Sequence, residues 1–109
     1  MTDDELLRWA AEDVLGWLPN VWHGDSRWLT ESAARRFDDD LLGWPGFGLA
    51  VTEIERRGWG WTIWGPLEDR CIAVDVFSMK QPDFDIEVTD GNYAVAAWRA
   101  LYQAMEATK

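Results

Sequence analysis

Three tryptophans, Trp59, Trp61 and Trp64, crowd the short stretch GWGWTIWGP at residues 58–66. Its composition is typical of a β-strand, in which successive side chains point to opposite faces. Trp59 and Trp61 then share one face and Trp64 lies on the other. A single sheet face does not bury three indole rings, so we expect either helices on both faces of the sheet or at least one exposed tryptophan.

Two further strands are predicted after this one. Residues 71–79 are almost continuously apolar and are broken chiefly by Asp75, which is typical of a central strand buried on both faces. Further along, Phe84, Ile86 and Val88 alternate with acidic residues, as expected of a half-exposed strand.

Helical patterns occur on both sides of these strands. The sequence from Thr2 to Glu5 is a capping box and starts a helix predicted to end near residue 17. A short helical turn is predicted at residues 30–36. Asp90 is the expected N-cap of a last helix over residues 91–106. The apolar stripe of the first helix is Leu6, Leu7, Ala10, Val14, Trp17 and Leu18, and that of the last is Ala94, Trp98, Leu101 and Met105.

A middle helix is predicted to follow Pro45 and Gly46 and to stop at Gly58. Its buried stripe is expected to be Phe47, Ala50, Val51 and Ile54, with Glu53, Glu55, Arg56 and Arg57 facing elsewhere. The predicted fold is therefore α+β, in the order α-α-β-β-β-α. It has a small antiparallel sheet of at least three strands and helices on one or both faces. A chain of 109 residues fits a single domain over residues 1–109.

The chain is strongly acidic. Twenty Asp and Glu oppose ten Lys and Arg, which gives a net charge of −10. Such a field repels nucleic acid and anionic membranes and steers the protein toward basic partners, although solubility alone also explains it. We expect no direct binding of nucleic acid.

Several functional classes are not expected. Cys71 is the only cysteine, so neither an internal disulfide nor a cysteine-based zinc site can form within one chain. The N-terminal residues lack the basic region of a signal peptide, and no apolar run approaches the ~20 residues of a membrane span. These features predict a cytoplasmic protein without a metal or cofactor.

Candidate catalytic residues are few. His23, the sole histidine, has Asp25 and Ser26 nearby, but neighbours in one loop rarely aim at one another as a catalytic triad requires. Cys71 is expected to be a small buried side chain rather than a nucleophile. The Gly-Phe-Gly sequence at residues 46–48 is a weak match to a phosphate-binding loop, because no strand precedes it. We therefore do not expect an enzyme.

Two acidic stretches are candidate binding surfaces. Asp83, Asp85 and Glu87 recur along one strand face with a spacing of roughly 6.6–6.8 Å. The phosphates of a nucleic-acid strand have a spacing of similar size, so these carboxylates could occupy a partner's nucleic-acid groove. A solvated strand face is the alternative, and a metal site needs converging oxygens instead of a straight row. The run Asp38, Asp39 and Asp40 is the second stretch, and Trp59, Trp61 or Trp64 could add an aromatic anchor.

Several segments resemble the phage ABA-sandwich domain family. They are AAEDVLGW (10–17) with the polar loop after it, the acidic turn before the middle helix, ERRGWGWTIW (55–64) and AVAAWRALYQAM (94–105). The resemblance covers most of the chain. It implies helices that sandwich a short sheet, an accessory protein of a phage or prophage, and a location in the cytoplasm of the infected or lysogenic bacterium. It brings no catalytic residues.

These observations favour a non-catalytic inhibitor that binds a basic, nucleic-acid-handling host defence protein, such as a CRISPR effector. One alternative is a small-molecule binder that sequesters a nucleotide between tryptophan rings, with Arg56 and Arg57 beside Trp59. Another is an immunity or antitoxin protein for a basic toxin. The sequence does not predict the oligomeric state.

Overall fold

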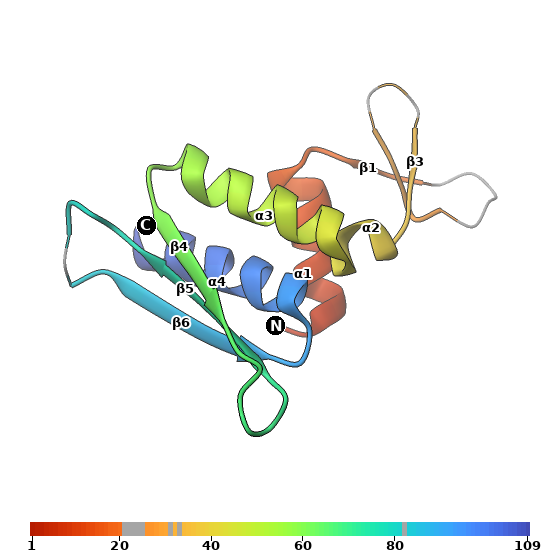
Figure 1. Ribbon diagram of the computed structural model, residues 1–109. Helices are drawn as coiled ribbons and strands as arrows, with labels where there is room; N and C mark the ends of the chain where they lie inside the picture. Colours follow the sequence, from red (N-terminus) through yellow and green to blue (C-terminus); the bar gives the residue numbers. More distant parts are fainter. Residues whose placement is uncertain (21–25, 31, 33, 82) are drawn as a thin grey trace.

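The computed structural model of this chain describes residues 1–20, 26–30, 32, 34–81 and 83–109. In the order of the chain, a helical segment leads to a small sheet, two helices, a second sheet and a final helix (Figure 1). No helix in these described ranges is long and apolar enough to cross a membrane.

The N-terminal helix is shorter than predicted and changes its type along its length. The capping box of Thr2 and Glu5 is present and starts α1 (Asp3–Trp9). A π-helical segment, η1 (Ala10–Val14), follows directly, and Gly16 with φ +71° turns the chain away. Leu6, Leu7 and Ala10 are buried as their helical spacing predicts. The predicted stripe is wrong at its end, because Leu18 lies beyond the helix and is 57% exposed.

The first sheet was not predicted. Its antiparallel strands are β1 (Leu18–Pro19), β2 (Trp28–Leu29) and β3 (Arg35–Arg36), with β2 in the middle. The prediction of a helical turn at residues 30–36 is wrong, because Arg35 and Arg36 pair with β2. Trp28 anchors this sheet in the core and is 1% exposed.

Two consecutive helices connect the sheets, namely α2 (Asp39–Leu42) and α3 (Trp44–Arg56). Three of the four predicted core residues of α3 are buried and Val51 is partly buried. The expectation that Glu53 faces away from the core is wrong: this residue is only 7% exposed. Its carboxylate is held by Arg56 (2.7 Å) and Arg57 (3.0 Å), so the buried charge is paired.

The second sheet is the one expected from the sequence. It consists of β4 (Gly60–Trp64), β5 (Ile72–Phe77) and β6 (Asp85–Asp90), all antiparallel. The central position of β5 is confirmed, but the expectation that both of its faces are buried is wrong, because the helices pack on one side only. The side chains of Val74, Val76 and Val88 point from it into the hydrophobic core.

The last helix, α4 (Tyr93–Ala107), packs on this sheet. Asn92 is its N-cap, whereas Asp90 was predicted; the Asp90 carboxylate instead accepts a hydrogen bond from the backbone N–H of Asn92 at 2.9 Å. Trp98 is completely buried, as its place on the helical stripe predicts.

The helices lie on one side of the second sheet (Figure 1). α4 contacts β5 and β6, α3 contacts β4 and α4, and α1 packs against α4. The α+β class and the small antiparallel sheet are confirmed, whereas the predicted element order lacks the first sheet and α2. No described element covers the other face of the second sheet, which therefore stays open.

Candidate functional site

The open face of the second sheet gathers acidic and aromatic side chains. The strand register places Thr62, Asp75 and Glu87 side by side across β4, β5 and β6. Trp64, Asp85 and Thr89 point to the same side because strand side chains alternate. We call the residues on this side of the three strands the open acidic face. They are Gly60, Thr62, Trp64, Ala73, Asp75, Phe77, Asp85, Glu87 and Thr89.

Asp75 lies at the centre of this face and was not among the predicted site residues. One oxygen of its carboxylate, Oδ2, accepts hydrogen bonds from the Thr62 hydroxyl at 3.2 Å and from the Trp64 indole N–H at 3.3 Å. The other oxygen, Oδ1, is shielded from solvent and has no hydrogen-bond partner among the described residues. The interruption of an apolar strand by one acid was the sequence signal that could have identified this residue.

Glu87 is electrostatically strained by Asp75. The two residues are direct cross-strand partners on β5 and β6, and like charges in that position repel each other. The negative charge of Asp75 is the main reason that the pKa of the Glu87 carboxyl is raised above its usual range, with partial desolvation and Asp85 adding to it. No Lys or Arg belongs to the open acidic face, so none of its own side chains neutralises these charges.

The predicted row of acids is only partly retained on this face. Asp85 and Glu87 belong to β6 and are exposed there, while Phe84, Ile86 and Val88 pack toward the core as expected. Asp83 is exposed too, but it lies in the turn before β6.

The three predicted tryptophans separate as the alternation required. Trp64 is 46% exposed on the open acidic face. Trp61 and Trp59 lie on the opposite face and are half-buried: Trp61 contacts the Phe47 ring edge to face, and Trp59 stacks on Phe84. Of the three predicted tryptophans, only Trp64 therefore lies on the same face as the carboxylates.

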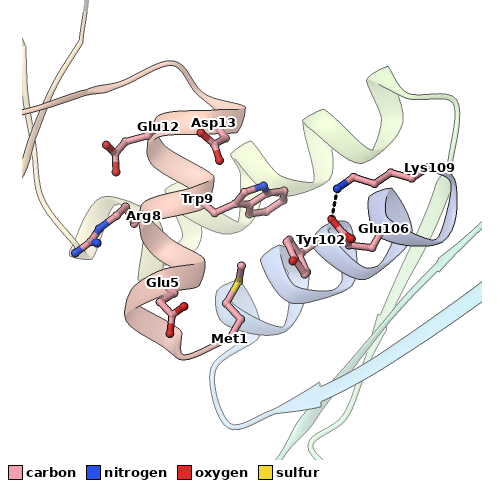
Figure 2. Close-up of a pocket in the computed structure, with 9 residues that line it drawn as sticks. All are labelled: Met1, Glu5, Arg8, Trp9, Glu12, Asp13, Tyr102, Glu106 and Lys109. Carbon is pink, nitrogen blue, oxygen red and sulfur yellow. Dashed lines mark ion pairs between the residues drawn. The ribbon is translucent and has the colours of Figure 1, made fainter.

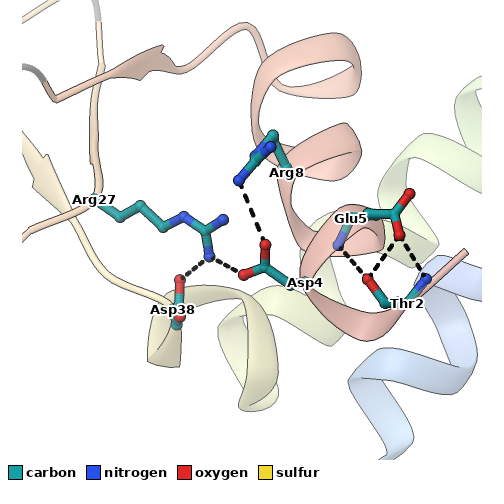
Figure 3. A network of polar contacts seen from close by, with 6 residues as sticks. All are labelled: Thr2, Asp4, Glu5, Arg8, Arg27 and Asp38. Atoms are coloured by element: carbon teal, nitrogen blue, oxygen red, sulfur yellow. Dashed lines mark hydrogen bonds and ion pairs between the residues drawn. The ribbon is translucent and has the colours of Figure 1, made fainter.

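The second acidic stretch is largely occupied by contacts within the molecule. Asp38 and Asp4 both bind the guanidinium of Arg27, at 3.4 and 2.7 Å (Figure 3). The hydrogen bond from Arg27 is the main reason that the pKa of Asp4 is lowered. Asp40 accepts a hydrogen bond from the backbone N–H of Phe37 at 2.7 Å. Only Asp39 is exposed without a side-chain partner among the described residues.

The described structure gives little support to a catalytic role for the residues considered above. His23 and Asp25 lie outside the described residues. Partial desolvation and the nearby charge of Asp69 raise the pKa of the Cys71 thiol, which keeps it protonated at neutral pH. The glycines at 46 and 48 lie within α3, and Gly46 is packed against Leu41, so this segment does not form a phosphate-binding loop.

Trp44 is an exposed aromatic residue that sequence reasoning missed. It is 65% exposed at the start of α3 and stacks on Tyr93 of α4, with ring centroids 4.2 Å apart. The sequence predicted that this helix starts after Pro45. Trp44 was therefore expected to lie in the preceding loop, and no role was predicted for it.

No family model matches the chain, and neither a curated protein nor a solved structure is significantly similar to it. Any functional conclusion therefore rests on the geometry of the open acidic face.

Proposed function

We propose that this protein is a non-catalytic binder of a basic protein and that the open acidic face is its docking surface. One observation carries the proposal. The Asp75 carboxylate accepts a hydrogen bond from the indole N–H of the exposed Trp64, and Glu87 and Asp85 lie on the adjacent strand β6, on a sheet face that no described element covers. Tryptophan within a polar surround is a frequent arrangement at the energetic centre of protein interfaces.

The electrostatics of the face favour a cationic partner. Asp75 and Glu87 repel each other in the free protein, and an arginine or lysine of the partner would relieve that repulsion. The net charge of −10 adds long-range attraction, which acts mainly on the rate of association. Burial of the Trp64 ring would then slow dissociation.

The partner class that fits best is a protein with a basic nucleic-acid groove, which these carboxylates would occupy. In this proposal the protein is an inhibitor of a host defence component, as its resemblance to small phage proteins implies. An immunity protein for a basic toxin would use the same surface, and only the identity of the partner separates the two.

The nucleotide-binding alternative has weaker support. It requires cationic side chains near an accessible indole, but Arg56 and Arg57 are both engaged by Glu53. One face of Trp59 is also stacked on Phe84, with ring centroids 5.5 Å apart.

Differential capture from a host lysate tests the proposal. The baits are the unmodified protein and variants of the open acidic face, Asp85→Asn/Glu87→Gln and Trp64→Ala. Captured basic proteins are then measured by surface plasmon resonance at low and high salt. We expect the double acid variant to associate more slowly with a weaker salt dependence, and Trp64→Ala to dissociate about tenfold faster.

Matched controls remove the same chemical groups elsewhere. Asp39→Asn/Glu68→Gln deletes two exposed carboxylates, and Trp44→Ala deletes an exposed indole. If these controls lose the captured protein as fully as the variants of the open acidic face, the docking surface is assigned wrongly. If every variant keeps unchanged rates at both salt concentrations, this face does not bind the partner.

A further inference from the structure

The outer edge of β6 is a row of backbone groups without a partner. β6 forms one border of the second sheet, whose order is β4-β5-β6, and no described helix or strand lies beyond it (Figure 1). Half of the backbone N–H and C=O groups of an edge strand point away from its one neighbour. No hydrogen bond joins such a group of β6 to another described residue. This edge is therefore able to pair with a further strand.

The strand register identifies the residues that carry these groups. The Ser78 N–H donates to the Phe84 carbonyl at 3.3 Å, in continuation of the register between β5 and β6. Backbone groups point alternately to the two sides of a strand, so every second residue after Phe84 also points to β5. The residues between them point outward. They are Asp85, Glu87 and Thr89, whose exposed side chains belong to the open acidic face.

The side chains of β6 favour a basic strand at this edge. Residues directly opposite each other on neighbouring strands interact, and opposite charges stabilise the pair while like charges destabilise it. Lysine or arginine opposite Asp85 and Glu87 would form such favourable pairs. A second copy of the chain would bring the same acids and no cation to this edge, because β6 contains no Lys or Arg. The acids therefore select against self-pairing as well as for a cationic segment.

Two other surfaces lack this combination of acids and unpaired backbone. The opposite border of the sheet, β4, contains no charged residue, and α3 contacts it. A groove of about 600 Å³ lies between the α1–η1 segment and α4 (Figure 2). Glu12 and Asp13 line this groove, but Arg8 and Lys109 line it too, and it includes no strand edge. Walls with charges of both signs do not select a basic ligand.

We propose that the basic partner adds an extended segment to β6 as a fourth antiparallel strand, in which lysine or arginine alternates with apolar residues. The cations lie opposite Asp85 and Glu87. The apolar residues lie beside the half-buried Ile86, on the side of the sheet that carries the helices. An antiparallel orientation matches every other strand pair of this sheet. The inference rests on the proposed function and specifies how the partner binds, while Trp64 on β4 stays available to the rest of that partner.

A capped seven-residue peptide, in which arginine alternates with valine, tests the inference at ~150 mM salt. NMR measures the exchange of each backbone amide hydrogen with water. At a peptide concentration ten times the Kd, we expect exchange of the Asp85, Glu87 and Thr89 amides to become about tenfold slower. The Ile86 and Val88 amides bond to β5 and should be protected with or without the peptide. Unchanged exchange at the three outward amides under saturating peptide would overturn the proposal.

Two N-methylated peptides of the same charge separate backbone pairing from charge attraction. In antiparallel addition the arginine N–H groups face β6 and the valine N–H groups face away. Methylation of the arginine nitrogens should weaken binding about tenfold, whereas methylation of the valine nitrogens should change it less than threefold. Equal affinities of the two peptides would mean that the cations act without strand pairing, and the proposal would be wrong.

Protein variants locate the bound peptide. Asp85→Asn/Glu87→Gln should weaken its binding about tenfold through the loss of two charge pairs. The control Asp39→Asn/Glu68→Gln removes the same net charge elsewhere and should leave the affinity within about twofold. Equal weakening in both double variants would mean diffuse attraction to an acidic protein and would overturn the proposal.

Failure of this inference differs from failure of the proposed function. A captured basic protein that binds through the open acidic face, but is not displaced by saturating peptide, would overturn strand addition alone. If the captured protein keeps its rates in all variants of the open acidic face while the peptide still protects the outward amides of β6, strand addition is supported and the proposed function is overturned.

Discussion

At the scale of single residues, Glu87 destabilises the folded protein through a charge that the proposed docking surface needs. Its charge opposes that of Asp75 across the β5–β6 ladder, and the raised pKa of Glu87 records the cost of holding both charges together. Since the pKa is higher in the folded than in the unfolded chain, the folded state binds this proton more tightly. The free energy of unfolding therefore rises as the pH falls through the pKa of Glu87, and it is lower at neutral pH, where Glu87 is charged.

Removal of this charge should stabilise the protein. We expect Glu87→Gln to have a higher Tm than the unmodified protein at pH 7, because the repulsion with Asp75 is gone. The difference should shrink as the pH is lowered through the carboxyl pKa, where the unmodified Glu87 is itself neutral. Thermal unfolding followed by circular dichroism from pH 3 to pH 8 measures it. The control is Glu68→Gln, which changes an exposed carboxylate that has no acid opposite it on a neighbouring strand. If Glu87→Gln and the unmodified protein have the same Tm at every pH, this account is wrong.

At the scale of elements, the contact between α2 and α3 depends on one glycine. A Cβ atom at Gly46 would lie 2.1 Å from the carbonyl oxygen of Leu41, which is backbone and cannot turn aside as a side chain would. Leu41 and Gly46 are both buried, so the two helices cannot separate without opening the core. At Gly48, two residues further along α3, the same Cβ atom would meet nothing within 4 Å.

The two glycines should respond to alanine with opposite signs. Gly46→Ala should reduce the free energy of unfolding by about 1–3 kcal/mol through overpacking. Gly48→Ala should increase it by about 0.5–1 kcal/mol, because alanine loses less backbone entropy in a helix. Urea denaturation of both variants and the unmodified protein provides the comparison. Stabilisation by both changes would show that α2 and α3 do not approach as closely as described.

At the scale of the whole molecule, the charge distribution opposes the binding of nucleic acid. The chain carries a net charge of −10, and its two adjacent arginine pairs are partly committed to other contacts. Arg56 and Arg57 bind Glu53, and the guanidinium of Arg36 lies over the ring of Trp17 at 5.9 Å. Phosphates would therefore meet few available cations.

We expect no measurable affinity for duplex DNA or single-stranded RNA at physiological salt. Even sequence-independent binding proteins reach dissociation constants of about 10⁻⁴ to 10⁻⁶ M there through many lysine and arginine contacts. Fluorescence anisotropy with labelled oligonucleotides is the measurement, repeated at low salt. Binding tighter than this range would contradict the prediction and also weaken the proposal that the open acidic face imitates nucleic acid.

Local periodicity predicted much of this structure. Alternation along β4 separates Trp64 from Trp59 and Trp61, and helical spacing predicts the burial of Trp98. These patterns are local, because each strand or helix repeats its own geometry along the chain. The short β1–β3 sheet has only two residues per strand, too few to show a period, and so it was missed.

The candidate site depends on contacts that no local pattern contains. The sequence by itself determined that Asp85 and Glu87 point away from the core. Only the tertiary structure decided that β5 sets Asp75 opposite Glu87, and that the helices pack on the other side of the sheet. The same holds for Glu53, which is buried because Arg56 and Arg57 pair with it at the end of α3. Register and layer packing are set by the burial of the whole core, so residues far apart in the chain become neighbours only when it forms.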